Sequence, residues 1–370
     1  MMMEKFYIQN DGMYLDHETG YGWFVDRNDN VLNQLNLKTR EIEYVCRLDA
    51  DMESPYRRTP FCYKKDHTII AFPDKGKKIC FYDEKEKTIE EYEIKAESNI
   101  RLGICCFGGF QEFIWAVSHG LNQIFLVDAG KKRIVRTYEV FRGKKQIQMG
   151  YESILNGNKI LCISGNSNCV SETDLLDGTE TVYELPAAEA GFNTICYDGG
   201  QYWLSGMNGN VYRWDHRKNT AEQIYAQNRT MYRSMKIGET ICFLPFNLEG
   251  DLCNKLLCCN IKEKRCFTIK ICEELKSGIY TFEYTKGSSV IGINDSENDF
   301  ITEINIENGM KDTAYFYASG EYLKKKRYGE VWLKMKCEKR LSESKAQDIG
   351  FYLKMIQMGE KNVQIDRIVF

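Results

Sequence analysis

The chain has 370 residues, of which 43% are hydrophobic and 28% are charged. This composition is typical of a soluble globular protein and gives no indication of a disordered or membrane-inserted chain. The 50 basic and 53 acidic side chains leave a net charge of -3, which provides no global attraction for nucleic acid or an anionic membrane. We therefore expect neither nucleic acid nor a membrane as a partner.

The start of the chain and its cysteines predict a cytoplasmic location. Residues 1–6 lack the basic region and the apolar stretch of a secretory signal, and no run approaches the roughly 20 apolar residues that cross a bilayer. The 15 cysteines are odd in number, and most of them lie in apolar stretches, as Cys80, Cys162 and Cys258 do. A free thiol in such a place acts as a small hydrophobic group.

A regular repeat runs along the chain. Seven Asp or Asn residues each end a short apolar stretch and begin a polar turn: Asn36, Asp83, Asp128, Asp174, Asp215, Asn260 and Asn305. Their successive spacings are 47, 45, 46, 41, 45 and 45 residues, and a period of about 20 to 50 residues indicates a repeat architecture. We interpret these side chains as turn-stabilising groups, because Asp and Asn bond to the backbone wherever a hairpin closes.

Each unit divides into four stretches that are rich in aromatic and β-branched residues and separated by Gly, Asn or Asp turns, which predicts four antiparallel strands. The clearest units have strands expected at 104–107, 113–117, 123–127 and 133–140, at 192–197, 201–205, 211–214 and 221–225, and at 280–284, 289–293, 300–304 and 312–317. A large apolar residue occupies one place in the second strand: Trp23, Ile70, Trp115, Leu161 and Trp203.

Seven four-stranded units predict an all-β fold, a seven-bladed β-propeller of four-stranded antiparallel blades over residues 12–320. Residues 1–11 would supply a strand that can close the ring. A C-terminal extension at 321–370 would contain an amphipathic helix at about 342–358, because Ser344 and Gln347 form a capping box. Either the segment Lys5 to Gln9 or the apolar segment Val363 to Phe370 is expected to close the ring, and the tail either caps the domain or docks on a partner.

The sequence of residues 202–215 resembles the repeat of two-component-regulator sensor propellers, and it is similar to streptogramin-lyase and sugar-lactonase propellers. The diglycines at 108–109 and 199–200 are similar to those of kelch repeats, and Trp214-Asp215 resembles a Trp-Asp repeat. Together they indicate the β-propeller superfamily and no single family. The resemblance to the lyase and lactonase propellers implies a metal held by His, Glu, Asn or Asp side chains at one channel mouth.

Few residues fit a metal site. Of the four histidines, only His119 follows a second strand, from which it can reach a mouth, whereas His67 and His216 lie in other turns. Five cysteines crowd the sixth unit, at Cys253, Cys258, Cys259, Cys266 and Cys272, but their spacings do not match the paired spacing of zinc sites. We therefore predict no metal and no cofactor, with a single divalent ion in the channel only under the enzyme alternative.

The best candidate site lies at the channel mouth. Glu152, Asn193, Arg233 and Thr281 occupy equivalent places near the start of the first strand in units four to seven, and each follows an aromatic residue, such as Tyr151 or Tyr232. Loops on the same mouth are basic, with Arg57, Arg58, Arg101 and Arg229. Such a mouth can bind an anionic group through charge-assisted bonds and stacking. Acidic residues in the same loops leave open the alternative of a mixed solvated rim.

We predict no catalytic residue, because the sequence contains no phosphate-binding loop, no nucleophile elbow and no His-Glu-x-x-His motif. We expect a non-catalytic binding or scaffold propeller that recognises a protein, a peptide or a small anionic ligand at the mouth formed by the loops between blades. The alternatives are a metal-dependent lyase or lactonase-like enzyme that acts in the central channel, and an intracellular sensor domain.

Overall fold

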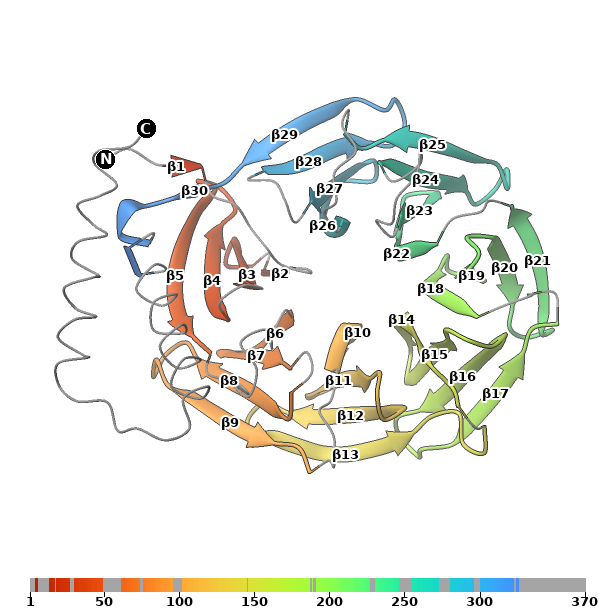
Figure 1. Cartoon of the computed structure of the whole chain (residues 1–370), viewed down its shortest axis with the longest axis horizontal. Coiled ribbons are helices and arrows are strands. Elements are labelled where there is room, and N and C mark those ends of the chain that lie inside the picture. The colour runs from red at the N-terminus through yellow and green to blue at the C-terminus, as the bar shows by residue number, and fades with distance from the viewer. Residues whose placement is uncertain are drawn as a thin grey trace, which may run out of the picture.

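The computed structural model is a ring of seven β-sheets around a central axis (Figure 1). It describes residues 4–5, 13–16, 18–26, 30–48, 61–73, 76–95, 102–144, 146–186, 188, 191–226, 230–245, 254–272, 280–295, 300–322 and 324–325, with backbone alone for 4–5, 61, 103–106, 280, 282–283 and 295. The predicted seven-bladed β-propeller of four-stranded antiparallel blades is confirmed. Among the described residues, no helix has the length and apolar character needed to span a membrane.

Each blade is built from four consecutive strands, the first of which lies next to the axis (Figure 1). Blade 1 contains β2 (Tyr14–Asp16), β3 (Tyr21–Asp26), β4 (Val31–Asn36) and β5 (Glu41–Arg47). Blade 2 contains β6 (Phe61–Lys65), β7 (Thr68–Phe72), β8 (Lys78–Asp83) and β9 (Ile89–Glu93). Blade 3 contains β10 (Leu102–Phe110), β11 (Phe113–Ser118), β12 (Gln123–Asp128) and β13 (Arg133–Glu139). Blade 4 contains β14 (Met149–Asn156), β15 (Lys159–Ser164), β16 (Cys169–Asp174) and β17 (Glu180–Glu184). Blade 5 contains β18 (Phe192–Tyr197), β19 (Tyr202–Gly206), β20 (Val211–Asp215) and β21 (Thr220–Tyr225). Blade 6 contains β22 (Met231–Ile237), β23 (Thr240–Pro245), β24 (Lys255–Asn260) and β25 (Cys266–Lys270). Blade 7 contains β26 (Tyr280–Lys286), β27 (Val290–Asp295), β28 (Phe300–Asn305) and β29 (Lys311–Tyr315).

Two very short strands join the ends of the ring on the outside of blade 1. After blade 7, β30 (Tyr317–Ala318) pairs in parallel with β5, and β1 (Glu4–Lys5) pairs antiparallel with β30. Residues 320–322 and 324–325 are helical, and the buried Tyr322 hydroxyl donates a hydrogen bond of 3.0 Å to Asn33 Oδ1 in blade 1. The helix expected at 342–358 and the apolar segment Val363 to Phe370 lie outside the described residues, so the domain boundaries stay a prediction.

The hydrophobic core lies in the layers between neighbouring blades. The large residue of each second strand is buried there, as predicted: Trp23, Ile70, Trp115, Leu161 and Trp203 are at most 5% exposed. Trp203, for example, packs with Phe243 of the next blade in one cluster. Burying a large apolar side chain contributes roughly 1.5–3 kcal/mol, so each blade depends on its neighbours for its stability.

The seven repeated Asp and Asn residues are the last residues of β4, β8, β12, β16, β20, β24 and β28. Their side chains accept backbone hydrogen bonds within the turn, as Asn36 Oδ1 does from Lys38 and Thr39, both at 3.0 Å. The interpretation as turn chemistry is confirmed. The fourth residue after each marker has a left-handed φ between 51° and 78°, at Arg40, Lys87, Lys132, Gly178, Asn219, Lys264 and Gly309. This conformation returns the chain into the fourth strand, and only two of the seven positions are glycine.

Candidate binding site at the central channel

The innermost strands β14, β18 and β22 lie next to one another around the axis (Figure 1). In each of them the sheet register shifts near the start of the strand, between Met149 and Ser153, between Phe192 and Thr194, and between Met231 and Arg233. A bulge of this kind re-aims side chains out of the regular alternation. Three of the site residues predicted from the sequence, Glu152, Asn193 and Arg233, fall at these bulges, and each is at most 8% exposed.

Glu152 ties three blades together. Its carboxyl group accepts hydrogen bonds from the Ile195 backbone N–H at 3.2 Å, the Ser234 backbone N–H at 2.9 Å and the Ser234 hydroxyl at 2.6 Å. The two N–H groups belong to the innermost strands of blades 5 and 6, whose inner edges have no further strand to pair with. Glu152 therefore satisfies backbone donors that the sheets leave unpaired at the axis.

Burial of Glu152 controls its charge. The residue is 8% exposed, and desolvation raises the pKa of its carboxyl to about 8, against the opposing effect of the hydrogen bonds from Ser234 and Ile195. At neutral pH the carboxyl is consequently mostly protonated, and it adds little negative charge to the channel.

Aromatic residues and a cation are neighbours of Glu152 and Ser234 in the sequence: Tyr151 precedes Glu152 on β14, and Tyr232 and Arg233 precede Ser234 on β22. The rings of Tyr151 and Tyr232 meet edge to face at 5.3 Å, and the half-buried His119 ring lies 6.3 Å from Tyr151. The Arg233 guanidinium lies 4.6 Å from the centre of the Tyr232 ring, within the range of a cation–π contact. Blades 3, 4 and 6 thus meet at one place on the axis.

Asn193, on β18 between those blades, completes the group. Its side chain is 1% exposed, and its Nδ2 donor has no hydrogen-bond partner among the described residues. We use the name channel cluster for the following residues: His119, Tyr151, Glu152, Asn193, Tyr232 and Arg233.

The structure places the remaining predicted residues elsewhere or does not describe them. Thr281 is buried on β26, one blade further round, where it faces Asn294 of β27. Arg57, Arg58, Arg101 and Arg229 lie outside the described residues, so the basic rim stays a prediction. Sequence reasoning missed Ser234, which donates two hydrogen bonds to Glu152 from 82 residues further along the chain, because no local pattern marks such a distant pair.

Neither the zinc site nor the metal site of a lyase- or lactonase-like enzyme has a set of ligands in the described part of the chain. In that part, no three His, Cys, Asp or Glu side chains are grouped to hold an ion. In blade 6, Cys258 and Cys259 point into different core layers. Cys259 also faces Cys266 across β24 and β25 and forms a disulfide with it, a pairing that the sequence analysis did not predict.

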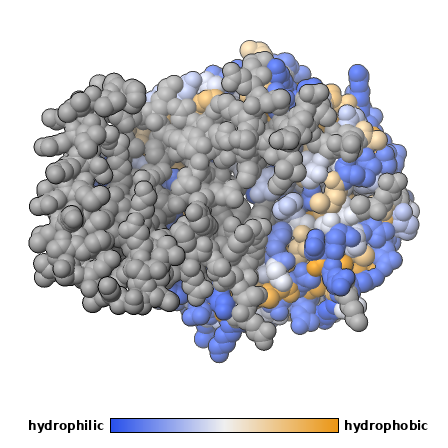
Figure 2. Space-filling view, viewed as in Figure 1, coloured by the Kyte–Doolittle hydropathy of each residue, from blue (hydrophilic) through white to orange (hydrophobic). Residues whose placement is uncertain are grey.

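Figure 2 shows one face of the ring, seen along the same direction as in Figure 1. On the face seen in Figure 2, the described surface is mainly hydrophilic, with small hydrophobic areas between the polar ones. Scattered apolar side chains are normal on soluble proteins, so these areas do not mark an interface by themselves.

No family model and no curated protein matches the chain. Among solved structures it is similar to the computationally designed Ika8 protein, with a TM-score of 0.57 and 9% identity over 85% of this chain and 91% of that chain. It is similar to a chain of the mitotic checkpoint complex, with a TM-score of 0.55 and 10% identity over 75% and 81%. It is also similar to BamB from Moraxella catarrhalis, with a TM-score of 0.53 and 13% identity over 78% and 82%. At these identities the likeness concerns the fold alone. It agrees with the β-propeller fold that the structure shows.

Proposed function

We propose that this protein is a non-catalytic binding propeller that recognises an acidic stretch of a protein or peptide partner at the channel cluster. The observation that carries the proposal is the convergence of His119, Tyr151, Tyr232 and Arg233 on one short section of the axis. Tyrosine and arginine are enriched among the residues that dominate binding energy, and here they are held by the rigid innermost strands.

The charge and donors of the channel cluster favour an anionic group. Because Glu152 is mostly protonated at neutral pH, Arg233 supplies the fixed charge of the cluster. The Asn193 amide adds a buried donor that has no partner within the described ranges. A carboxylate accepts hydrogen bonds from both kinds of group, and bonds to charged donors are the stronger ones. A small anionic ligand would bind to the same side chains. The cytoplasmic location of the protein stays a prediction.

The test selects peptides from a random displayed library on the full chain and then measures the affinity of the best ones. We expect the selected peptides to be enriched in Asp and Glu, and Arg233→Gln to weaken their binding at least tenfold. Asn193→Leu should weaken it as well, because the amide is replaced by an apolar group of similar size. Arg217→Gln, which removes an exposed arginine from a turn of blade 5, is the matched control and should leave binding unchanged.

Selected peptides without acidic enrichment, or peptides that bind Arg233→Gln as tightly as the wild type, would refute the proposal. Competition distinguishes the two sources of a carboxylate. If succinate displaces the peptides at low millimolar concentration, a small dicarboxylate is the better ligand. If it does not, the peptide is recognised through more than its acidic group. Melting temperatures of all variants check that they fold.

A further inference from the structure

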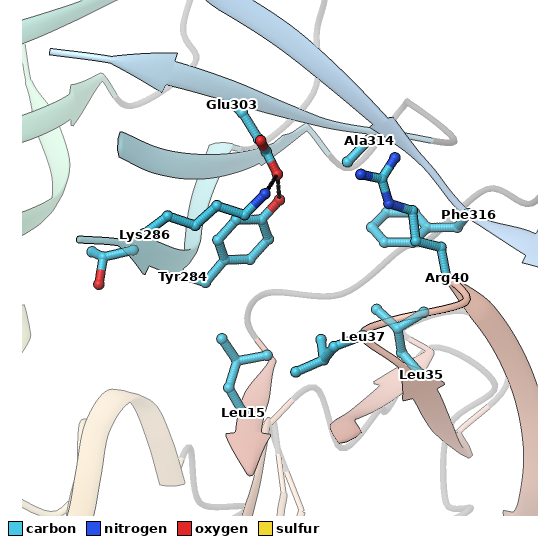
Figure 3. A pocket seen from close by; sticks show the side chains of 10 residues that line it. Leu15, Leu35, Leu37, Arg40, Tyr284, Lys286, Glu303, Ala314 and Phe316 are labelled. Atoms are coloured by element: carbon cyan, nitrogen blue, oxygen red, sulfur yellow. Dashed lines mark hydrogen bonds and ion pairs between the residues drawn. The ribbon is translucent and has the colours of Figure 1, made fainter. Parts of the chain in front are cut away.

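A cavity of about 230 Å³ lies where the ring closes, between blade 7 and blade 1 (Figure 3). Its apolar wall comes from Leu15 on β2, Leu35 and Leu37 around the end of β4, and Phe316 after β29. This seam is independent of the channel cluster, since the two share no residue.

The local structure explains why space remains at this seam. The innermost strand of blade 1, β2, has three residues, whereas β26 of blade 7 has seven. On the other side, the Tyr284 ring lies over Gly292, where a Cβ atom would come within 2.7 Å of the ring. The ring therefore occupies the space over the backbone of its own blade that a larger side chain at position 292 would fill.

The acidic group of the cavity is already neutralised. Glu303 Oε1 accepts a hydrogen bond from the Tyr284 hydroxyl and another of 2.5 Å from Lys286 Nζ, as Figure 3 shows. The Glu303 side chain is 12% exposed, so this ion pair is screened less than a surface pair. Lys286 and Glu303 together contribute no net charge.

Arg40 adds a further cation to the lining of the cavity. Its backbone is fixed on both sides, because its N–H donates to Asn36 O at 2.7 Å and its carbonyl accepts from Tyr317 N–H at 3.0 Å. Its side chain has no hydrogen bond or ion pair with any residue that the structure describes, and its guanidinium lies beside the cavity next to Ala314 and Phe316 in Figure 3. The cavity therefore combines an apolar wall with one positive charge at its edge.

We propose that this seam cavity binds a small apolar carboxylate, with the hydrocarbon part between Leu15, Leu37 and Phe316 and the carboxylate on Arg40. The size fits, because an apolar cavity of about 150 Å³ holds one benzene ring, and 230 Å³ leaves room for a ring with a short chain. The charge fits as well, because the planar guanidinium binds a carboxylate through two parallel hydrogen bonds.

Calorimetric titration of the full chain with 4-phenylbutanoate and with its neutral amide tests the proposal. We expect the acid to bind at least tenfold more tightly than the amide, and Arg40→Gln to remove that preference. Leu15→Trp, which fills the cavity, should abolish the binding of both compounds, whereas the charge-matched control Arg217→Gln should change neither. The proposal is overturned if the acid does not bind at millimolar concentration, if acid and amide bind alike, or if Arg40→Gln retains the preference. Because Arg40→Gln alters a partly exposed side chain, it keeps the test decisive even if Leu15→Trp fails to fold.

Discussion

Replacing Glu152 by Gln should remove a pH dependence of stability that the buried carboxyl creates. Burial raises the pKa of Glu152 to about 8 in the folded chain, compared with an ordinary value of 4.5. Between these values the folded chain holds a proton that the unfolded chain has released, so stability is fully present below pH 4.5 and falls as the pH rises through 8. The slope is about 1.4 kcal/mol per pH unit, and the full loss is roughly 5 kcal/mol as an upper limit.

The assay is urea unfolding of the wild type and Glu152→Gln at each pH unit from 5 to 9. The substituted side chain places an amide nitrogen opposite one of the three donors, so at pH 5 the variant should be less stable by about 1–3 kcal/mol. The difference between the two proteins should shrink as the pH rises and change sign between about pH 6 and 7, because only the wild type titrates at this site and it loses about 1.4 kcal/mol per pH unit. Glu139→Gln, at an exposed place on β13, is the control and should follow the wild type. Parallel pH profiles for the wild type and Glu152→Gln would refute the reasoning.

Two further predictions concern the turns and the inter-blade contacts. Gly309→Ala should destabilise the protein by about 1–2 kcal/mol in urea unfolding, because φ is 72° while an added Cβ meets no atom within 4 Å, whereas Gly120→Ala, equally open but without a left-handed φ, should be neutral. Equal effects of the two substitutions would contradict the backbone explanation. Partial burial acts to raise the pKa of Asp16, but hydrogen bonds from Lys64 and Thr19 outweigh it and lower the pKa to about 2. The stability from this group is present above pH 3.8 and is lost as the pH falls towards 2, so Asp16→Asn should flatten acid unfolding in that range, and an unchanged acid profile would contradict the assignment.

The repeat could be predicted from the sequence because it arises from interactions between residues that are close in the sequence. Asn36 and its six equivalents mark hairpin turns through bonds to residues two or three places away, and such bonds leave a regular period. The large residue of the second strand, such as Trp203, is likewise a local signal, since every blade must fill the same space against its neighbour.

The channel cluster could be predicted only in part. The equivalence of Glu152, Asn193 and Arg233 followed from the repeat, and they lie on adjacent innermost strands as that equivalence requires. The partnership of Glu152 with Ser234 could not be predicted, because bulges set the direction of the side chains and the register of a bulge is not visible in one sequence. The seam cavity could not be predicted either, since it depends on the short strand β2 and on the position of the Tyr284 ring over Gly292.

The most direct test of the account is to locate a bound partner on the protein. A selected acidic peptide that carries a photoreactive benzophenone would be cross-linked to the full chain, and the modified residues would be identified by mass spectrometry. The account predicts cross-links within β14, β18 and β22, which are lost in Arg233→Gln. Cross-links confined to the outermost strands, such as β17, β21 and β25, would contradict the assignment of the channel cluster as the recognition site.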